Sequence, residues 1–350
     1  MSAISSTRSA SEVTGVTSLR TRTSSTPGET FMRRLIPSAL VAIVLLATAG
    51  CGGSSSDSQA KSGGLDTVTV GAIPIVDVAP LYVGQTQGFF KAQGIDLKVV
   101  NTTGGAAAVP GVVNGTFDFA FGNVASLILA RSQGIPLKAI AEGDSSTGKD
   151  GKDFGGVVVP KGSAITSAAQ LAGKTVAVNN LKNIGDTTVR ASIAKAGGDP
   201  SSVKFVELAF PDMPAAVAKG RVDAAWIVEP FLTIAQDQGA RVIASNFVDA
   251  APNLTVATYF TTEQTTKSKA DLTKRFIAAI EKSLQYTQEH PDAARKALLT
   301  YTKIDSAVAA KITLPAWPAK INKESVQTIA DLMLKDGLIS KKVDVGDLLP

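Results

Sequence analysis

Short apolar runs separated by polar, glycine-bounded stretches recur along the chain, most clearly over residues 67–123. Residues 67–70, 96–100 and 118–121 have the β-branched or alternating pattern of buried strands. Between the first two, residues 81–90 have the spacing of a helix that packs one face on a sheet, and Gly94 offers a stop. The order strand, helix, strand, repeated, predicts an open α/β sheet whose ligand site lies at the strand ends.

The pattern then changes twice along the chain. A strand is expected at 137–141 and a polar surface loop at 143–156, after which strands at 156–160, 175–178, 203–207 and 223–228 alternate with helices. A strand at 256–260 precedes a mainly helical tail, in which Leu272, Phe276, Ile280 and Leu284 share one face. We therefore predict two doubly wound α/β lobes joined by two crossing strands, with the tail packed on lobe one. The expected boundaries are 66–160 and 254–350 for lobe one and 161–253 for lobe two.

The first 65 residues read as an export segment. Residues 1–31 are Ser/Thr-rich without apolar periodicity and are expected to be disordered, or to precede the true start at Met32. Residues 32–50 combine a basic head, an apolar run and small residues, which is the pattern of a signal peptide. Cys51, the only cysteine, resembles the acylated residue of a bacterial lipobox, although Thr48 replaces the usual leucine; an ordinary signal peptide is the alternative. Residues 51–65 then form a flexible linker.

Charge and residue inventory exclude several functions. Five of the 35 basic and two of the 30 acidic residues precede Cys51, which leaves a net charge of about +2 and no case for nucleic acid. The single histidine, His290, stands before a proline at a helix end, so a catalytic triad or a histidine metal site is not expected. Neither a phosphate-binding loop nor a complete dinucleotide motif occurs. We expect no catalytic residue, no metal and no cofactor, and hence no enzyme.

Several short motifs, in this order, resemble one family: Gln87-Gly88-Phe89-Phe90, Gly94-Ile95-Asp96-Leu97, Gly104-Gly105, Gly115 with Asp118, Asp223-Ala224, and Glu229-Pro230. From about residue 66 onward the chain is similar to the solute-binding proteins of ABC importers for nitrate, sulfonates, taurine and thiamine-pyrimidine precursors. The resemblance implies a type 2 periplasmic binding protein fold. It also implies a monomer outside the cytoplasmic membrane, held there by the lipid on Cys51, that delivers a small molecule to a permease and its ATPase.

Candidate ligand-binding residues in lobe one follow predicted strands. Asp77 can accept a hydrogen bond from a ligand or cap the helix that begins near Pro80. Gly104 and Gly105 can bring backbone N–H groups close to a ligand or simply serve a turn. Asn123 and Ser126 can likewise contact a ligand or serve a turn. Tyr82 is the remaining candidate in lobe one.

Lobe two contributes Asn180, the helix start Asp186-Thr187-Thr188, and Glu229. The helix start can hold an anionic group or be capped, and Glu229 can contact ligand, form a hinge, or fix a turn after a fully apolar strand. Trp226 is expected in the core. Helix N-termini favour a small anion such as a sulfonate, taurine or nitrate, whereas Asp77 and Glu229 would suit an uncharged or cationic pyrimidine precursor. An enzyme related to pyrimidine-precursor synthases is the further alternative.

Overall fold

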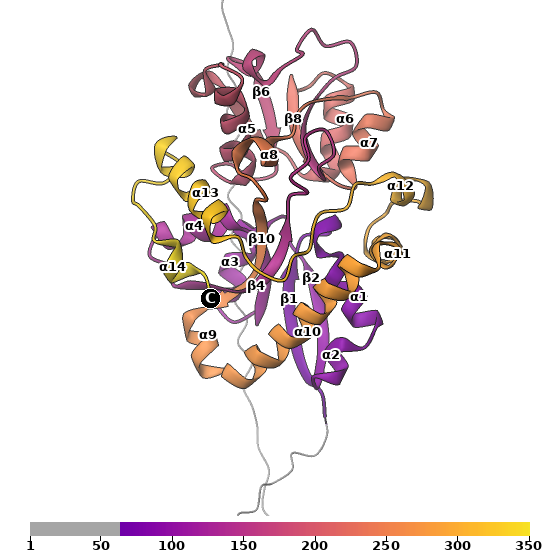
Figure 1. Cartoon of the computed structure of the whole chain (residues 1–350), viewed down its shortest axis with the longest axis vertical. Coiled ribbons are helices and arrows are strands. Elements are labelled where there is room, and N and C mark those ends of the chain that lie inside the picture. The colour runs from indigo at the N-terminus through magenta and orange to yellow at the C-terminus, as the bar shows by residue number, and fades with distance from the viewer. Residues whose placement is uncertain (1–63) are drawn as a thin grey trace, which may run out of the picture. The chain divides into compact units, whose positions relative to one another are not determined.

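The computed structural model describes residues 64–350 (Figure 1). The expectations for the disordered start, the signal peptide, Cys51 and nearly all of the linker lie outside the described residues. All of the described residues belong to one compact unit. Within residues 64–350, no helix has the length and apolar character needed to cross a membrane.

The first sheet has the strand order β2-β1-β3-β10-β4. Strands β1, β2 and β3 are parallel, whereas β10 returns antiparallel between β3 and β4. Its strands are β1 (Asp66–Ala72), β2 (Ile95–Asn101), β3 (Phe119–Asn123), β4 (Leu137–Ser145) and β10 (Thr255–Thr262). The intervening helices are η1 (Val76–Val78), α1 (Ala79–Thr86), α2 (Phe89–Ala92), α3 (Gly105–Val113) and α4 (Val124–Ser132). The expected helix over 81–90 is broken into α1 and α2 because Gly88 adopts a φ of 74°.

The second sheet has the order β7-β6-β8-β5-β9. Its strands are β5 (Gly155–Val159), β6 (Thr175–Val178), β7 (Lys204–Glu207), β8 (Ala224–Val228) and β9 (Arg241–Ala244). Its helices are η2 (Ala168–Leu171), α5 (Ile184–Lys195), η3 (Pro200–Ser202), η4 (Phe210–Asp212), α6 (Met213–Ala218), α7 (Phe231–Asp237) and α8 (Asn246–Ala250). Because β5 pairs antiparallel with β8 and β9, the expected boundary at residue 160 is wrong, and lobe two begins before residue 155.

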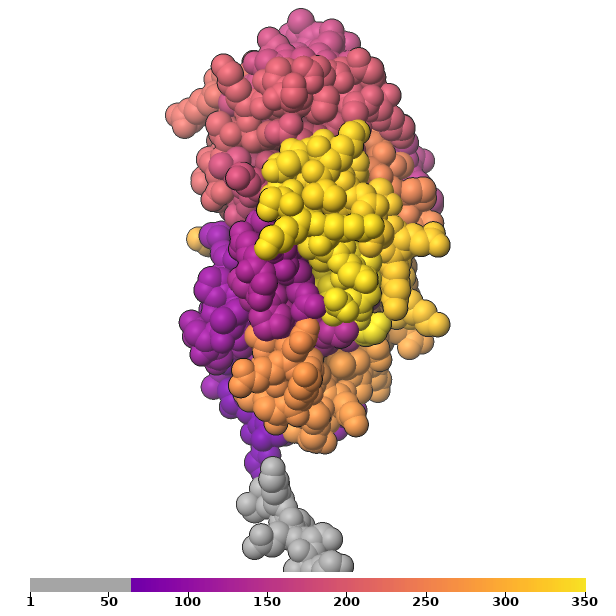
Figure 2. All heavy atoms as spheres, turned by 90° about the vertical axis from the view of Figure 1, so that its left-hand side faces the viewer, coloured from indigo at the N-terminus to yellow at the C-terminus, as the bar shows by residue number. Residues whose placement is uncertain are grey.

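The C-terminal tail contains six helices: α9 (Glu263–Ser268), α10 (Ala270–Glu289), α11 (Pro291–Tyr301), α12 (Ser306–Lys311), α13 (Lys323–Lys335) and α14 (Val345–Leu348). Helix α10 buries Phe276, Ile280 and Leu284 on one face, as the spacing predicts, and lies against α1. The tail does not pack on lobe one alone. Helix α12 contacts α7 (Figure 1), and α13, yellow in Figures 1 and 2, contacts both α4 and α5. The tail therefore links the two lobes as a third connection.

Strand β4 is longer than the sequence predicted. It continues to Ser145, and every residue from Ala139 to Ser145 is buried, so the expected surface loop begins only after the strand. An isolated backbone bridge to Ala316 covers its end. Two acidic residues, Glu142 and Asp144, are thereby buried inside the protein.

Candidate functional site: a cavity between the lobes

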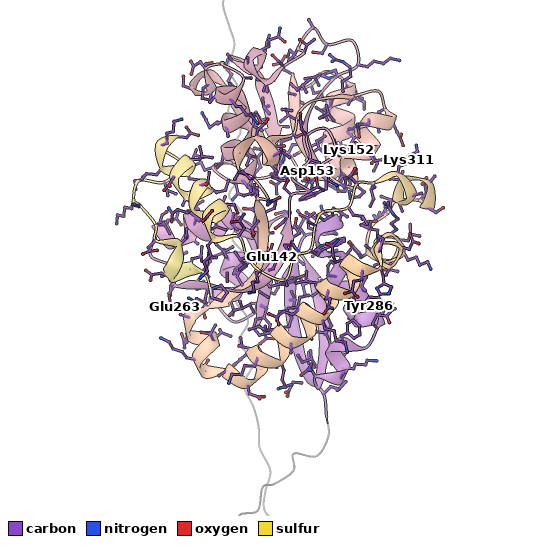
Figure 3. The ribbon with its side chains drawn as sticks, viewed as in Figure 1. Glu142, Lys152, Asp153, Glu263, Tyr286 and Lys311 are labelled. Atoms are coloured by element: carbon purple, nitrogen blue, oxygen red, sulfur yellow. The ribbon has the colours of Figure 1, made fainter. Side chains whose placement is uncertain are left out.

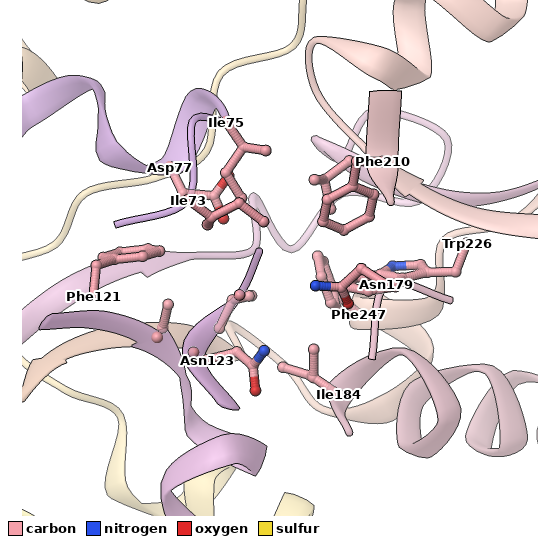
Figure 4. Close-up of a pocket in the computed structure, with 16 residues that line it drawn as sticks. Ile73, Ile75, Asp77, Phe121, Asn123, Asn179, Ile184, Phe210, Trp226 and Phe247 are labelled. Carbon is pink, nitrogen blue, oxygen red and sulfur yellow. The ribbon is translucent and has the colours of Figure 1, made fainter. Parts of the chain in front are cut away.

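A small cavity of about 30 Å³ lies where the carboxyl-terminal strand ends of the two sheets face each other (Figure 4). Its walls are largely apolar, and three polar side chains reach it, Asp77, Asn123 and Asn179. The apolar lining includes Ile73, Ile75 and Phe121 from lobe one and Ile184, Phe210, Trp226 and Phe247 from lobe two. A mainly apolar cavity with a few converging polar groups is the usual form of a small-molecule site.

An aromatic wall faces the cavity from lobe two. Phe210 and Phe247 both pack nearly edge-on against Trp226, with ring centroids 5.3 and 5.8 Å apart. Behind the indole, a Cβ on Gly185 would lie 2.5 Å from a ring carbon, so the close approach of α5 requires glycine there. Trp226 is buried as expected for a core residue, yet it also lines the cavity, and its indole N–H has no partner within the described chain.

Gly104 and Gly105 line the cavity at the start of α3. Gly104 has a φ of 154°, and a Cβ there would lie 2.4 Å from Oδ1 of Asn180, which comes from lobe two. A Cβ on Gly105 would lie 2.7 Å from Cα of Gly122. These glycines therefore serve close backbone packing, and the same packing leaves the helix start at the cavity surface. Asn180 contacts this turn and does not itself line the cavity.

Asn123 caps α4 and also borders the cavity. Its Oδ1 accepts hydrogen bonds from the backbone N–H and the hydroxyl of Ser126 at 2.9 and 3.1 Å. Asn183 of lobe two donates from Nδ2 to the same hydroxyl at 3.0 Å. Ser126 thus ties the lobes together from a buried position, while the amide nitrogen of Asn123 is left for other partners (Figure 4).

Asp77 is the charged residue that lines the cavity. The capping alternative is wrong, because helix α1 has no side-chain cap and the residue at its N-cap is Val78. Asp77 is only 3% exposed, and its Oδ2 has no partner within the described chain. Burial raises the pKa of Asp77 to about 7, partly offset by a backbone hydrogen bond, and nearby Asp153 raises it further.

Two interactions hold the segment that carries Asp77. Tyr301 of α11 donates its hydroxyl to the carbonyl oxygen of Ile75 at 2.9 Å, and Trp317 donates its indole N–H to the carbonyl oxygen of Asp77 at 3.2 Å. Tyr82, expected to bind ligand, instead stacks on Tyr301 with ring centroids 3.9 Å apart and is not among the lining residues. Its role in this structure is therefore to support the segment from behind.

Behind Asp77 lie carboxyl groups that sequence reasoning missed. Asp144 ends β4, pairs in register with Ala257 of the cavity wall, is fully buried, and has no partner for either carboxyl oxygen within the described chain. Burial raises the pKa of Asp144 well above its ordinary value, and repulsion from Asp77, Glu142 and Asp153 adds to this. Acidic residues directly after the predicted strand at 137–141 are the available signal, but their polar sequence is also typical of a surface loop.

Glu142 and Asp153, both labelled in Figure 3, are buried carboxyl groups whose oxygens accept hydrogen bonds. Glu142 accepts from the hydroxyls of Ser145 and Thr255 at 3.1 and 3.3 Å, and burial raises its pKa to about 9. Asp153, on the segment that joins β4 to β5, accepts from the Ser146 hydroxyl at 2.5 Å and from two backbone N–H groups. Burial also raises the pKa of Asp153.

Glu229 does not line the cavity. Its carboxylate accepts from the backbone N–H and the hydroxyl of Thr233 at 3.0 and 2.8 Å, and from the backbone N–H of Thr313 at 3.1 Å. It therefore holds the start of α7 and ties lobe two to the tail. Burial raises its pKa.

The side chains expected to hold an anion at the start of α5 are hydrogen-bonded within the helix or to the turn before it. Helix α5 begins at Ile184, and the Thr187 and Thr188 hydroxyls donate to the carbonyls of Asn183 and Ile184 one turn earlier, at 2.9 and 2.6 Å. Asp186 accepts from the backbone N–H of Lys182 at 2.9 Å. These side chains satisfy the helix, and none of them lines the cavity.

The sequence is similar to proteins of known function. Residues 75–294 match the family described as NMT1/THI5 like. The formylaminopyrimidine-binding protein of Halalkalibacterium halodurans is 25% identical over 276 residues, which cover 76% of this chain and 78% of that protein. The 4-amino-5-hydroxymethyl-2-methylpyrimidine phosphate synthase THI5 of Saccharomyces cerevisiae is 29% identical over only 98 residues, or 28% of this chain and 27% of that protein.

Solved structures of binding proteins share the fold. The alkanesulfonate-binding protein SsuA from Xanthomonas axonopodis pv. citri, bound to MOPS, aligns with a TM-score of 0.68 at 18% identity, covering 82% of this chain and 99% of that one. The periplasmic nitrate-binding protein NrtA from Synechocystis PCC 6803 aligns with a TM-score of 0.70 at 15% identity, covering 81% and 86%. The predicted two-lobed periplasmic binding protein fold is therefore confirmed.

Proposed function

Because the chain belongs to the NMT1/THI5-like family, we propose that it is the extracytoplasmic solute-binding component of an ABC importer. Its ligand is an uncharged or cationic pyrimidine of the thiamine-precursor type, held between the lobes and passed to a permease. The observation that carries the ligand class is Asp77, a buried carboxyl group with an unpartnered oxygen in an aromatic-walled cavity. The formylaminopyrimidine-binding protein, as a relative over most of the chain, supports the same class.

The cavity suits a flat ring with hydrogen-bond donors at its edge. Phe210, Trp226 and Phe247 offer apolar area and ring edges, and Phe121 closes the opposite side. An amino group on the ring can donate to Asp77, and the amide groups of Asn123 and Asn179 can accept from or donate to ring substituents. This distribution of apolar walls and edge polarity is what an aminopyrimidine requires.

A small anion, which the N-terminus of a helix would favour, is the second candidate for the ligand. The start of α3 at Gly104 does reach the cavity, which supports an anion there, and a helix start is worth about 0.3–1 kcal/mol to a negative group. However, Asp77 is next to it, and an anion would oppose any negative charge on this carboxyl group. No Lys, Arg or His forms an ion pair with Asp77, Glu142, Asp144 or Asp153 within residues 64–350. We therefore favour the pyrimidine over sulfonate, taurine or nitrate.

The enzyme alternative has no supporting observation in the site. His290, the only histidine, lies at the junction of α10 and α11, where its ring stacks on Tyr286 at 4.0 Å between centroids. It is not among the residues that line the cavity. The match to the yeast synthase covers little more than a quarter of the chain. The proposal is therefore a binding protein.

A thermal-shift screen tests the proposal. The purified protein is heated with aminopyrimidines, among them formylaminopyrimidine, and in parallel with alkanesulfonates, taurine and nitrate. At a hundredfold excess over Kd, a ligand raises the free energy of unfolding by about 2.7 kcal/mol. We expect stabilisation by an aminopyrimidine and none by the anions. Stabilisation by a sulfonate, taurine or nitrate without any by a pyrimidine would contradict the proposed ligand class.

A further inference from the structure

Four carboxyl groups converge behind the cavity from three segments of the chain: Asp77 on η1, Glu142 and Asp144 on β4, and Asp153 on the segment between β4 and β5. The titratable groups that face them from the surrounding helices and strands are tyrosines, namely Tyr82 on α1, Tyr259 on β10 and Tyr301 on α11. Within residues 64–350, no basic side chain forms an ion pair with any of the four. The protein therefore gathers acidic groups here without supplying their counter-charge.

These carboxyl groups differ in how well their oxygens are satisfied. Glu142 and Asp153 accept hydrogen bonds from neighbouring hydroxyl and backbone groups. In contrast, one oxygen of Asp77 and both oxygens of Asp144 are buried without a partner in the described chain, as is the hydroxyl of Tyr259. A buried polar group without a partner costs roughly 1–3 kcal/mol, so folds rarely retain several of them together without a use.

The unpartnered oxygens of Asp77, Asp144 and Tyr259 lie in one region of the protein. Asp144 stands opposite Ala257, and Ala257 lines the cavity together with Asp77. Tyr259 lies two residues further along β10, and its ring contacts Phe121 of the cavity wall at 5.4 Å between centroids. Strand β4 and η1 are also in contact. Asp77 therefore lines the cavity opposite the aromatic wall of lobe two, and Asp144 and Tyr259 are fully buried behind the cavity wall formed by Ala257 and Phe121.

We propose that Asp77 and Asp144 form a subsite that binds its ligand as a cation of the amidinium type, and that binding releases a proton to solvent. This rests on the proposed function, which leaves the ligand uncharged or cationic. An amidinium presents two parallel N–H groups, which match the two oxygens of one carboxylate. The second carboxyl group stays protonated, because two carboxylates so close together cannot both be charged.

The proton balance fixes the sign of the pH dependence. In the unbound protein, burial keeps the carboxyl groups protonated, and the pKa of Asp77 is raised to about 7. When the cation enters, an O–H bond of one carboxyl group breaks, the proton goes to solvent, and the carboxylate pairs with the amidinium. Affinity for a cation therefore rises as pH rises toward 7, by about tenfold per pH unit where one full proton is released. An anion would do the reverse and take up a proton.

Three ring compounds of nearly one shape test this on the wild-type protein. Benzamidinium is a cation in neutral solution, benzamide is neutral, and benzoate is an anion. Calorimetry at pH 6 in buffers of different ionisation heat gives both the Kd and the number of protons exchanged. We expect benzamidinium to bind at least about tenfold more tightly than benzamide and to release about one proton. Equal binding of benzamidinium and benzamide, absent binding of benzamidinium, or release of no proton would overturn the proposal.

A pair of variants locates the subsite. Asp77→Asn removes the carboxyl group that lines the cavity and keeps its shape, so benzamidinium affinity should fall about tenfold while benzamide affinity stays unchanged. Glu229→Gln is the matched control, since Glu229 is also a buried carboxyl group but is bonded to Thr233 and Thr313 outside the cavity. It should leave the number of released protons unchanged. An Asp77→Asn protein that still binds benzamidinium as the wild type does would overturn the proposed subsite.

The test of the cationic subsite and the test of the proposed function can fail independently of each other. If the screen finds an aminopyrimidine that binds, but benzamidinium binds no better than benzamide, the importer function stands and the cationic subsite fails. If benzamidinium binds with proton release while no aminopyrimidine stabilises the protein, the subsite stands and the pyrimidine ligand fails.

Discussion

Replacing Asp77 by Asn should make the unliganded protein more stable at pH 8 and leave it nearly unchanged at pH 4. Burial raises the pKa of Asp77 from its ordinary 3.8 to about 7. Between these two values the unfolded chain loses the proton that the folded chain keeps, so the folded state binds more protons. The free energy of unfolding therefore falls as pH rises from about 4 to about 7 and stays lowered above that. A difference of about three pKa units corresponds to about 4 kcal/mol.

Asparagine does not titrate, so the variant lacks this decrease while the rest of the pH profile is shared. For a protein of this size, about 4 kcal/mol corresponds to an increase in Tm of roughly 8 to 16 °C at pH 8. Scanning calorimetry of both proteins at pH 4, 6 and 8 measures the difference. The pH 4 pair is the internal control, because at that pH the folded chain keeps the Asp77 proton and the unfolded chain has lost it only in part. A Tm difference that is the same at pH 4 and pH 8, or a variant less stable at pH 8, would refute the argument.

Three further variants test other parts of the structure. Gly104→Ala should weaken ligand binding at least about tenfold, because the added Cβ would lie 2.4 Å from Oδ1 of Asn180. Calorimetry with a pyrimidine found in the screen measures the affinity, and an unchanged affinity would contradict the close approach of Gly104 to Asn180. Thr188→Val should lower stability by about 1 kcal/mol, because the hydroxyl bonds Asn246 and Ile184, and should leave ligand affinity unchanged; lost affinity at full stability would restore the helix-start site. Cys51→Ser should abolish labelling by a fatty-acid analogue and release the protein from membranes, and a variant that stays labelled and membrane-bound would disprove lipidation at Cys51.

Most elements of the fold were predictable because buried strands bounded by glycine, and one-sided helices, leave a periodic record in the sequence. The strand at 175–178 and the helix face formed by Phe276, Ile280 and Leu284 are confirmed for this reason. What periodicity does not encode is the sheet to which a strand belongs. Residues 156–160 have the same apolar pattern whether the strand pairs with lobe one or lobe two. Only the pairing of β5 with β8 and β9 assigns it to the second sheet.

The site was partly predictable from position along the chain. Asp77, Gly104, Gly105 and Asn123 were expected because they follow strands, and all four line the cavity. Asp144 was missed, because charged residues after a short apolar run resemble a surface loop and nothing local reveals that β4 continues inside the protein.

Thr187 and Thr188 illustrate the opposite error. Hydroxyls in the first turn of a helix can face a ligand, but they can equally bond to the carbonyl four residues earlier, and in this helix both do. Glu229 is similar, since a carboxylate after an apolar strand needs partners, and here the start of α7 and the tail supply them. Sequence identifies residues that need partners, whereas only the packed structure decides whether a ligand is one of them.

The stability cost at Asp77 and the proposed binding of a cation are two aspects of one arrangement. A group that destabilises the unliganded protein at pH 8 is a group that a cationic ligand can relieve, so the ligand should recover part of the same free energy. The increase in Tm caused by benzamidinium at a fixed excess should therefore be larger at pH 8 than at pH 5, because binding at pH 5 must first remove a proton. Asp77→Asn should be more stable without ligand and should lose most of this ligand-induced increase. If the variant gained stability and kept the full increase at pH 8, the cost at Asp77 and the binding of the cation would be unrelated.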